Sequence, residues 1–385
     1  MRYHLTPNGP KRCIAKKGNC KYSGQLHGSI EQIEKAYEKQ HEHMSLVSAK
    51  KSDNNKINSN DNNVNFGIAS VESNRKFESA VIDKISVDKD LLEESRRQEK
   101  VLQEAIRQGR DFTDEEIASR ADYVERVTSM LRSEGLETHK LMFDENGNPS
   151  SERREVMESV VEQSLALYSD IPKEKKSILT GGIGGAGKGT ILRGKGLDKT
   201  YATINPDDTK ELMAVNGFIP NIPGLTAMES STLAHREAVI YSTKVYETLI
   251  SQGKNINIDA TMGNIASVKK DVKNLTGAGY DIRGIFVDID NDTSIVRGNG
   301  RYKKSMDNFA KNGGVGIGGR PVPRIVNKPP ENPVFSSSSV ENFAKVHGAG
   351  LFSQAEVWNN DGSKPVQVDV DDFVGDTFRG KAWEW

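Results

Sequence analysis

The chain has 385 residues, a length that allows two or three domains. Its 53 basic and 54 acidic side chains give a net charge of −1, which argues against a polycation that coats nucleic acid. Two cysteines exclude a disulfide-dense secreted scaffold. No apolar run approaches the roughly 18 residues of a membrane span, and the N-terminus lacks the apolar core of a secretory signal. We therefore expect a cytoplasmic protein without a membrane or nucleic acid partner.

Residues 1–44 are predicted to form a small basic module. The stretch 1–21 holds six basic side chains and no acid, and Gly9, Pro10 and Gly18 favour loop over helix there. A short helix is expected at 29–43, where apolar residues follow a helical period.

Three side chains in this module have the residue types of a zinc site. Cys13, Cys20 and His27 are separated by six residues each, with His4 nearby, and four such ligands could hold Zn²⁺ tetrahedrally. The spacing between the cysteines is wider than the about two to four residues of common zinc sites. Two reduced cytosolic thiols are therefore the simpler interpretation.

An Asn-rich linker is predicted at 45–74 and a helical region at 75–148. Seven of the thirteen residues at 53–65 are asparagine, and such sequence buries too little surface to offset its ordering entropy. In the helical region, Thr113 to Glu116 is a capping box that should start a helix ending near Gly135. A small helical bundle is the simplest interpretation. A partner-binding surface and a built-in inhibitor of the following domain are the alternatives.

Residues 149–385 alternate short apolar strands with helices, which predicts a mostly parallel sheet covered on both faces. The fold class is therefore α/β, with a helical region before it. Helices are expected at 151–168 and 225–252, and strands at 177–180, 201–204, 255–258 and within 282–289.

A glycine-rich loop after the first of these strands carries the strongest signal. Gly182 to Lys188 fits G-x-x-x-x-G-K between a strand and an apolar helix start. Glycines let backbone N–H groups curl around phosphates, and Lys188 would neutralise the β- and γ-phosphates. Gly189 stands where Ser or Thr usually follows, so Thr190 is the nearest hydroxyl for Mg²⁺. The nucleotide-binding set is Gly182, Gly184, Gly185, Ala186, Gly187, Lys188, Gly189 and Thr190.

Carboxylates follow two further strands of the predicted sheet. Asp207 comes after the strand at 201–204, where it could accept a proton from a substrate hydroxyl. Asp208 fits a helix N-cap better than Asp207 does. Asp259 could hold Mg²⁺ through water and Thr261 could touch substrate, although a plain strand-end turn also explains this pair.

Arg297, Arg301 and Arg320 accompany a stretch, 313–319, in which five of seven residues are glycine. Phosphoryl transfer requires cations on the charged oxygens. Arginine supplies them in bidentate geometry, and a glycine-rich lid could carry it to the site.

Together these motifs resemble the zeta toxin family over about 150–372. The resemblance rests on one ordered set: the strand and phosphate loop, Ile204 to Asp208, His235 to Ala238, Ile258 to Thr261, Arg297 to Arg301, Gly319 to Pro323, and Ala355 to Gly362.

The resemblance implies a P-loop kinase that uses ATP and Mg²⁺ and has an antitoxin as a partner. It implies UDP-N-acetylglucosamine as the UDP-sugar substrate, phosphorylated on the sugar's 3′-hydroxyl, which poisons cell-wall precursor synthesis. Ala260 and Gly189 depart from the family pattern, and Gly189 affects the metal position. The implied roles are catalytic for Asp207 as base, Lys188, Arg301 and Arg320; metal-binding for Thr190 and Asp259; and substrate-binding for Glu237, Asp259, Thr261 and Arg297.

Two other functions are considered. The order G-K-G-T resembles the phosphate loop of adenylate kinases, which suggests a nucleotide kinase; the Asp-Gly-Phe-Pro-Arg segment of that family is absent. An interaction protein is the second alternative. In it the basic cluster at 1–21 binds nucleic acid or a partner and the nucleotide fold is a switch.

Overall fold

A computed structural model of the protein describes residues 3–6, 9–12, 27–28, 74, 77–86, 88–321, 329–375 and 377–378. The chain divides into two compact units, Met1–Ile68 and Ala69–Trp385. Cys13, Cys20, the helix predicted at 29–43 and the predicted linker up to residue 73 lie outside the described residues.

The first unit contains a three-stranded antiparallel sheet in the order β2-β1-β3. Its strands are β1 (Tyr3–Thr6), β2 (Gly9–Arg12) and β3 (His27–Gly28). The loop predicted for 1–21 is therefore wrong over 3–6 and 9–12. Pro10 is tolerated because β2 is an edge strand of this sheet, where a missing N–H costs no ladder bond on the outer side. His4 and His27 are opposite each other in the register.

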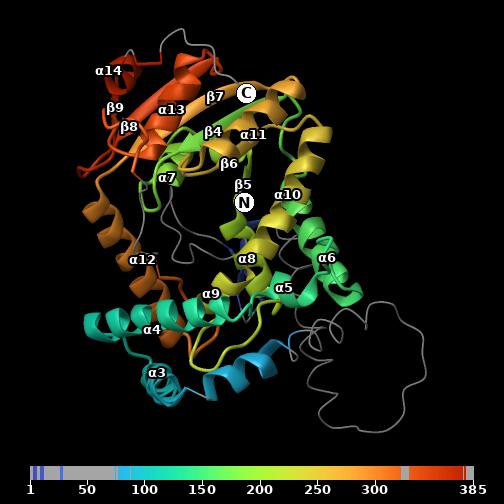
Figure 1. The fold of residues 1–385 in the computed structure, drawn as a ribbon, viewed down its shortest axis with the longest axis vertical. Coiled ribbons are helices and arrows are strands. Elements are labelled where there is room, and N and C mark those ends of the chain that lie inside the picture. The colour runs from blue at the N-terminus through green and yellow to red at the C-terminus, as the bar shows by residue number, and fades with distance from the viewer. Residues whose placement is uncertain are drawn as a thin grey trace. The chain divides into compact units, whose positions relative to one another are not determined.

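The second unit is built on a six-stranded sheet in the order β5-β6-β4-β7-β8-β9 (Figure 1). The first five strands are parallel, and β9 runs antiparallel to β8. The predicted strands are confirmed within one or two residues at each end. The bounds are β4 Lys176–Gly181, β5 Ala202–Ile204, β6 Ile256–Asp259, β7 Asp281–Asp288, β8 Gln354–Asn359 and β9 Val366–Val368.

Both faces of the sheet are covered, as the α/β class requires. Leu179 and Phe286 pack on one face with residues of α10 (His235–Ser251), α11 (Ile265–Gly277) and α13 (Ser338–Gly348). Ile178 and Val287 pack on the other face with α7 (Lys188–Gly194). Because alternate residues of β4 and β7 point to opposite faces, the central strands are apolar on both. The last helix among the described residues of this unit is α14 (Val370–Val374).

The helices of the helical region pack on one another, and their core is shared with neighbouring segments of the same unit. The region comprises a helix at 77–86, α3 (Lys89–Gln108), α4 (Asp114–Ser133) and α5 (Thr138–Met142), and α4 starts with the predicted capping box. Val81 and Val127 share a cluster with Leu233, and Leu102 shares another with Met306 of α12 (Asn291–Lys311). Figure 1 shows α12 reaching from the sheet toward α3 and α4. These helices are thus packed onto the α/β part of the chain.

The helix predicted at 225–252 is divided into three pieces. They are α9 (Ala227–Ser230), a 3₁₀ turn at Ser231–Ala234, and α10. The Ser231 hydroxyl donates to the Met228 carbonyl at 2.7 Å, and such side-chain bonds compete with regular helix at serine and threonine. The remaining helices in this part are α6 (Ser151–Leu167) and α8 (Pro206–Val215).

None of the helices in the described part of the chain combines the length and the apolar character needed to span a bilayer.

Candidate active site

The glycine-rich loop joins β4 to α7 at the carboxyl end of the central strand. Gly182 has φ +114°, and a Cβ there would lie 2.2 Å from the Val287 carbonyl oxygen, so only glycine fits. The N–H groups of Lys188 and Gly189 open α7 and have no acceptor within the helix. This is the backbone geometry that binds phosphate.

Lys188 lies beside the end of β6. Its Nζ donates to the Gly182 carbonyl at 2.7 Å and is 3.7 Å from Oδ1 of Asp259. Burial lowers the pKa of Lys188, and the nearby Asp259 carboxylate acts against it. Asn205 donates to the other Asp259 oxygen at 3.0 Å, so the carboxylate is fixed between β5 and β6.

Asp207 lies in the first turn of α8, directly after β5. Its Oδ1 is 2.8 Å from Nζ of Lys210, and its Oδ2 pairs with Arg320. Burial would raise the pKa of Asp207, but Arg320 and Lys210 outweigh it and hold that pKa below its usual value. Asp207 is therefore ionised at neutral pH and held between two cations.

Asp208 has the opposite electrostatic environment. Partial withdrawal of the carboxyl from water, together with the negative charges of Glu211, Asp259 and Asp207, raises the pKa of Asp208 to about 7, although the residue as a whole is exposed. A carboxyl whose pKa is higher in the folded protein than in the unfolded chain destabilises the fold when it is ionised. The loss of folding free energy therefore grows as pH rises from the unfolded-state pKa to the folded-state pKa. This pH range runs from about 4, the ordinary value of an aspartate, to about 7.

We expect Asp208→Asn to raise the melting temperature slightly at about pH 8 and less at about pH 5, the effect being small because water screens a charge on an exposed side chain. The reason is that asparagine removes a charge whose cost is fully developed only above the folded pKa. Thermal melts of the two proteins across this range measure the effect. A gain that does not depend on pH, or a loss at about pH 8, would contradict the assigned environment.

The three predicted arginines occupy different positions. Arg320 pairs with Asp207, and Arg301 is close enough to Lys188 for its charge to lower that lysine's pKa further. Arg297 donates to the carbonyl oxygens of Asn360 at 2.8 Å and Gly362 at 3.3 Å. Arg297 thus supports the turn after β8, and its contact with substrate stays a prediction.

That turn contains a residue that sequence reasoning left out of the site. The side-chain amide of Asn360 donates to the Ala186 carbonyl at 2.7 Å, which clamps the phosphate loop from the β8 side. Thr261 supports the same loop through its carbonyl, which accepts from the Gly182 N–H at 3.3 Å. Lys210 was also missed, although its i,i+3 spacing from Asp207 on a helix was a usable signal.

The structure does not bring Glu237 to the site. Glu237 is fully buried and forms an ion pair with the equally buried Arg153. His235, two residues earlier, lies near the charged groups of Lys210, Asp207 and Arg320 instead. Burial lowers the pKa of His235, and nearby Lys210 lowers it further while Asp207 opposes it. The substrate role predicted for Glu237 is therefore withdrawn.

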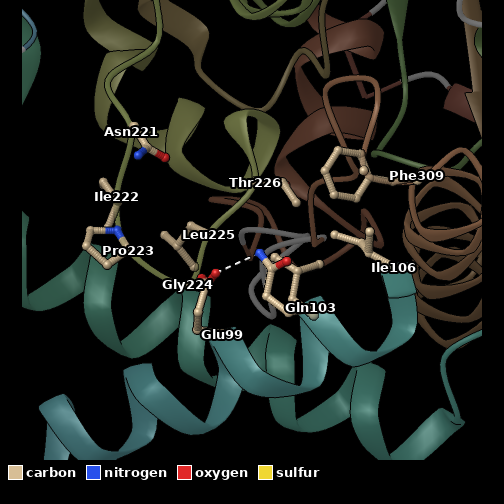
Figure 2. A pocket seen from close by; sticks show the side chains of 13 residues that line it. Glu99, Gln103, Ile106, Asn221, Ile222, Pro223, Gly224, Leu225, Thr226 and Phe309 are labelled. Carbon is tan, nitrogen blue, oxygen red and sulfur yellow. Dashed lines mark hydrogen bonds between the residues drawn. The ribbon is translucent and has the colours of Figure 1, made fainter. Parts of the chain in front are cut away.

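A cavity lies apart from the phosphate loop. It has a volume of about 540 Å³ between α3, the loop 221–226 and the end of α12 (Figure 2). Leu102, Ile106 and Phe309 give it apolar walls, and Glu99 accepts from Gln103 at its edge at 2.8 Å. None of the described residues that line it belongs to the phosphate loop, so it does not mark the reaction centre.

The residues around the phosphate loop have the chemical groups needed to bind a nucleotide together with a divalent cation. The loop offers backbone N–H groups and Lys188 to phosphate oxygens. Thr190 is exposed in the first turn of α7, and Asp259 is partly exposed at the end of β6. A hydroxyl and a carboxylate are ligand types that Mg²⁺ accepts beside phosphate oxygens.

The family described as Zeta toxin matches residues 160–365. Among solved structures, the PezAT toxin–antitoxin system of Streptococcus pneumoniae is 17% identical, with 53% of this chain and 76% of that chain covered and a TM-score of 0.38. AvrRxo1-ORF1:AvrRxo1-ORF2 with sulphate ions is 16% identical, with 58% and 69% covered and a TM-score of 0.42. The form of that complex with ATP is 16% identical, with 58% and 68% covered and a TM-score of 0.39. No curated protein matches the chain.

Proposed function

Because the chain belongs to the zeta toxin family, we propose that it transfers the γ-phosphate of ATP to a hydroxyl of a UDP-sugar. The 3′-hydroxyl of UDP-N-acetylglucosamine is the first candidate acceptor. The observation that supports this most is the position of Asp207, an ionised carboxylate in the same charge cluster as the phosphate-loop Lys188. A carboxylate there can orient an acceptor hydroxyl toward the γ-phosphate.

The roles of the residues follow from their positions. Lys188 and the loop N–H groups hold the phosphates, while Arg301 and Arg320 neutralise charge on the transferred group. Thr190 and Asp259 would hold Mg²⁺, which would neutralise negative charge on the phosphates. Asp207 accepts the proton of the acceptor hydroxyl as the bond from the acceptor oxygen to the γ-phosphorus forms and the bond from that phosphorus to ADP breaks.

The lowered pKa of Asp207 suits this reaction. The transition state of phosphoryl transfer is loose, so catalysis depends more on position and charge than on a strong base. Lys210 keeps Asp207 ionised even when Arg320 turns toward a bound phosphate, because its Nζ pairs with the other carboxylate oxygen. The acceptor hydroxyl then meets a carboxylate that is ready to accept its proton.

The family also motivates proposals about the cell. Phosphorylated UDP-N-acetylglucosamine would poison cell-wall precursor synthesis, so the protein would act as a cytoplasmic toxin. An antitoxin protein would then be its partner. Both statements depend on the acceptor being the proposed one.

Incubation of the full chain with ATP, Mg²⁺ and a panel of UDP-sugars and nucleoside monophosphates tests the proposal. Mass spectrometry should find one added phosphate on UDP-N-acetylglucosamine, and fragmentation should place it on the sugar. Phosphate on a nucleoside monophosphate alone would favour a nucleotide kinase. ADP without any phosphorylated acceptor would contradict the UDP-sugar proposal.

A further inference from the structure

A fully buried ion pair joins the helical N-terminal region to the rest of the molecule. Arg120 of α4 and Glu229 of α9 are both 0% exposed. The Arg120 guanidinium donates two bonds of 2.6 Å, one to each carboxylate oxygen. It also donates to the Gly224 carbonyl at 2.8 Å. This fork geometry fixes the direction of the carboxylate as well as its charge.

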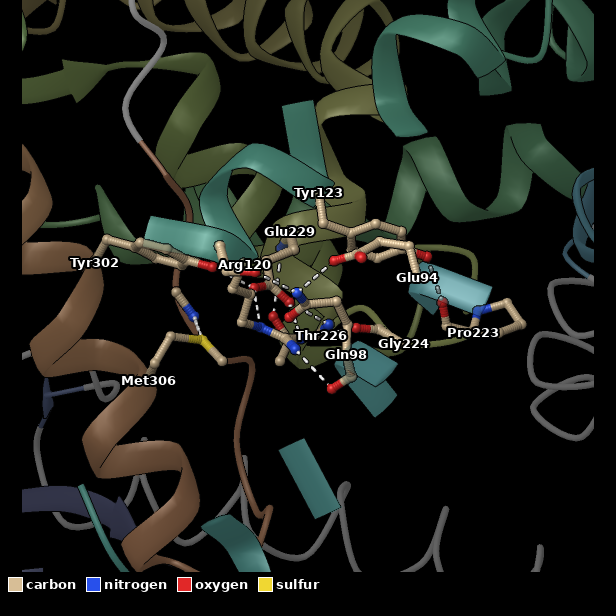
Figure 3. A network of polar contacts seen from close by, with 12 residues as sticks. Glu94, Gln98, Arg120, Tyr123, Pro223, Gly224, Thr226, Glu229, Tyr302 and Met306 are labelled. Atoms are coloured by element: carbon tan, nitrogen blue, oxygen red, sulfur yellow. Dashed lines mark hydrogen bonds and ion pairs between the residues drawn. The ribbon is translucent and has the colours of Figure 1, made fainter. Parts of the chain in front are cut away.

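Two further donors complete the surroundings of Glu229 (Figure 3). The hydroxyl of Tyr302 on α12 donates to Oε1 at 2.5 Å, and the Thr226 N–H donates to Oε2 at 2.7 Å. Three segments far apart in sequence therefore meet at one carboxylate: α4, the start of α9, and α12. Burying a carboxylate without such donors would destabilise the fold, so the contacts to Glu229 hold the three segments together as a unit.

Both phosphate-binding arginines are attached to this unit. Arg301 directly precedes Tyr302 on α12. Arg320 follows a segment, 317–319, that runs between α9 and α12. The Ile317 carbonyl accepts from the Met228 N–H at 2.9 Å, and the Gly319 N–H donates to the sulfur of Met306 at 3.3 Å.

This segment is packed tightly, in contrast to the flexible lid expected from its glycines. Gly318 has φ +76°, and a Cβ there would lie 2.3 Å from Oγ1 of Thr226. Thr226 in turn forms a capping box with Glu229. The glycine thus permits close approach to α9, and Arg320 leaves a fixed backbone toward Asp207.

We propose that Arg120, Glu229 and Tyr302 are positioning residues that set the placement of Arg301 and Arg320 for phosphoryl transfer. The inference rests on the proposed function for the roles of the two arginines. It makes the helical N-terminal region a structural part of the active site, since Arg120 comes from that region.

The chain provides a matched control for this idea. Arg153, Glu237 and Tyr241 form a second buried triad, in which the Tyr241 hydroxyl donates to the carboxylate that Arg153 pairs with. Its residues come from α6 and α10, and none of its described hydrogen bonds reaches α12 or 317–319. Tyr302→Phe and Tyr241→Phe therefore delete the same group from two similar environments.

We expect Tyr302→Phe to lower kcat by about tenfold and to leave KM for ATP within about twofold, since misplaced catalytic groups affect the transition state most. The rate of ADP formation is divided by the concentration of ATP-binding sites found by titration, so that a smaller folded fraction does not lower the measured kcat. Arg120→Lys, which keeps the charge and loses the fork, should act in the same direction. Tyr241→Phe should keep kcat.

Amide exchange of 313–320 provides a readout that does not depend on the acceptor. It should become faster in Tyr302→Phe and stay unchanged in Tyr241→Phe. If wild type phosphorylates no UDP-sugar, the proposed acceptor fails, and exchange still decides the positioning role. Equal losses of kcat in both variants, or unchanged kcat and exchange in Tyr302→Phe, would overturn the inference.

Discussion

Asp207→Asn is expected to lower the rate of phosphoryl transfer by about 10²–10⁴-fold, the range that a positioned general base contributes. Asparagine has nearly the same shape but cannot accept the proton of the acceptor hydroxyl. It also leaves Lys210 and Arg320 without the carboxylate that pairs with both. ATP affinity should change little, because the phosphate loop is untouched. Single-turnover transfer and ATP titration separate the two effects.

The stability of this variant should depend on pH. Because the folded pKa of Asp207 is lowered, its contribution to stability is present above the usual carboxylate pKa of about 4 and is lost as pH falls through the lower folded value. The deficit of Asp207→Asn in thermal melts should therefore shrink at acid pH. Asp208→Asn is the matched control for activity. If it abolished transfer while Asp207→Asn retained full activity, the base would be Asp208.

Lys188→Met is expected to reduce transfer by at least about 10²–10³-fold, as for loss of one donor from a charged transition state. The stem of the side chain remains, whereas the cation that faces the β- and γ-phosphates is removed. Burial lowers the pKa of Lys188, so its charged form is costly in the free protein. The variant should consequently melt no lower than wild type at neutral pH. Rate measurements at saturating ATP, together with thermal melts, check both statements.

Lys195→Met is the corresponding control at the other end of α7. Lys195 pairs with Glu356 at 2.9 Å, and its Nζ lies 5.2 Å from the centroid of the Trp358 ring. The charge change is the same, but no phosphate-loop contact is lost. A similar fall in rate for both variants would indicate a general effect of charge and would argue against the assigned role of Lys188.

The phosphate loop and the sheet could be predicted because their signals are local. The phosphate-loop signal lies within Lys176–Gly194, where a strand, a glycine-rich turn and the start of a helix follow one another. Polar residues also come directly after the apolar strands in the sequence. Parallel topology then brings the ends of β4, β5 and β6 to one edge, so the grouping of Lys188, Asp207 and Asp259 at that edge could be predicted from sequence.

The supporting residues could not be predicted in the same way. The pattern of α4 shows which face is buried, but it does not reveal that Arg120 meets Glu229, 109 positions away. The position of Glu237 could not be predicted because its partner, Arg153, lies 84 positions away in the sequence. On a helix, residues two apart point about 200° away from each other, so His235 and Glu237 cannot face the same site.

The contacts of the helical region also bear on its role. Its helices share clusters with α12 and with 222–233, and Arg120 completes the surroundings of Glu229. These contacts favour a supporting role over the built-in inhibitor considered from sequence.

The most direct test of the central claim follows the γ-phosphate of ATP in a single turnover, with wild type and Asp207→Asn, in the presence and absence of UDP-N-acetylglucosamine. We predict that wild type moves the labelled phosphate onto the sugar nucleotide, that hydrolysis to inorganic phosphate is much slower, and that Asp207→Asn does neither at a comparable rate. Equal release of inorganic phosphate with and without the acceptor, or unimpaired transfer by Asp207→Asn, would contradict the account.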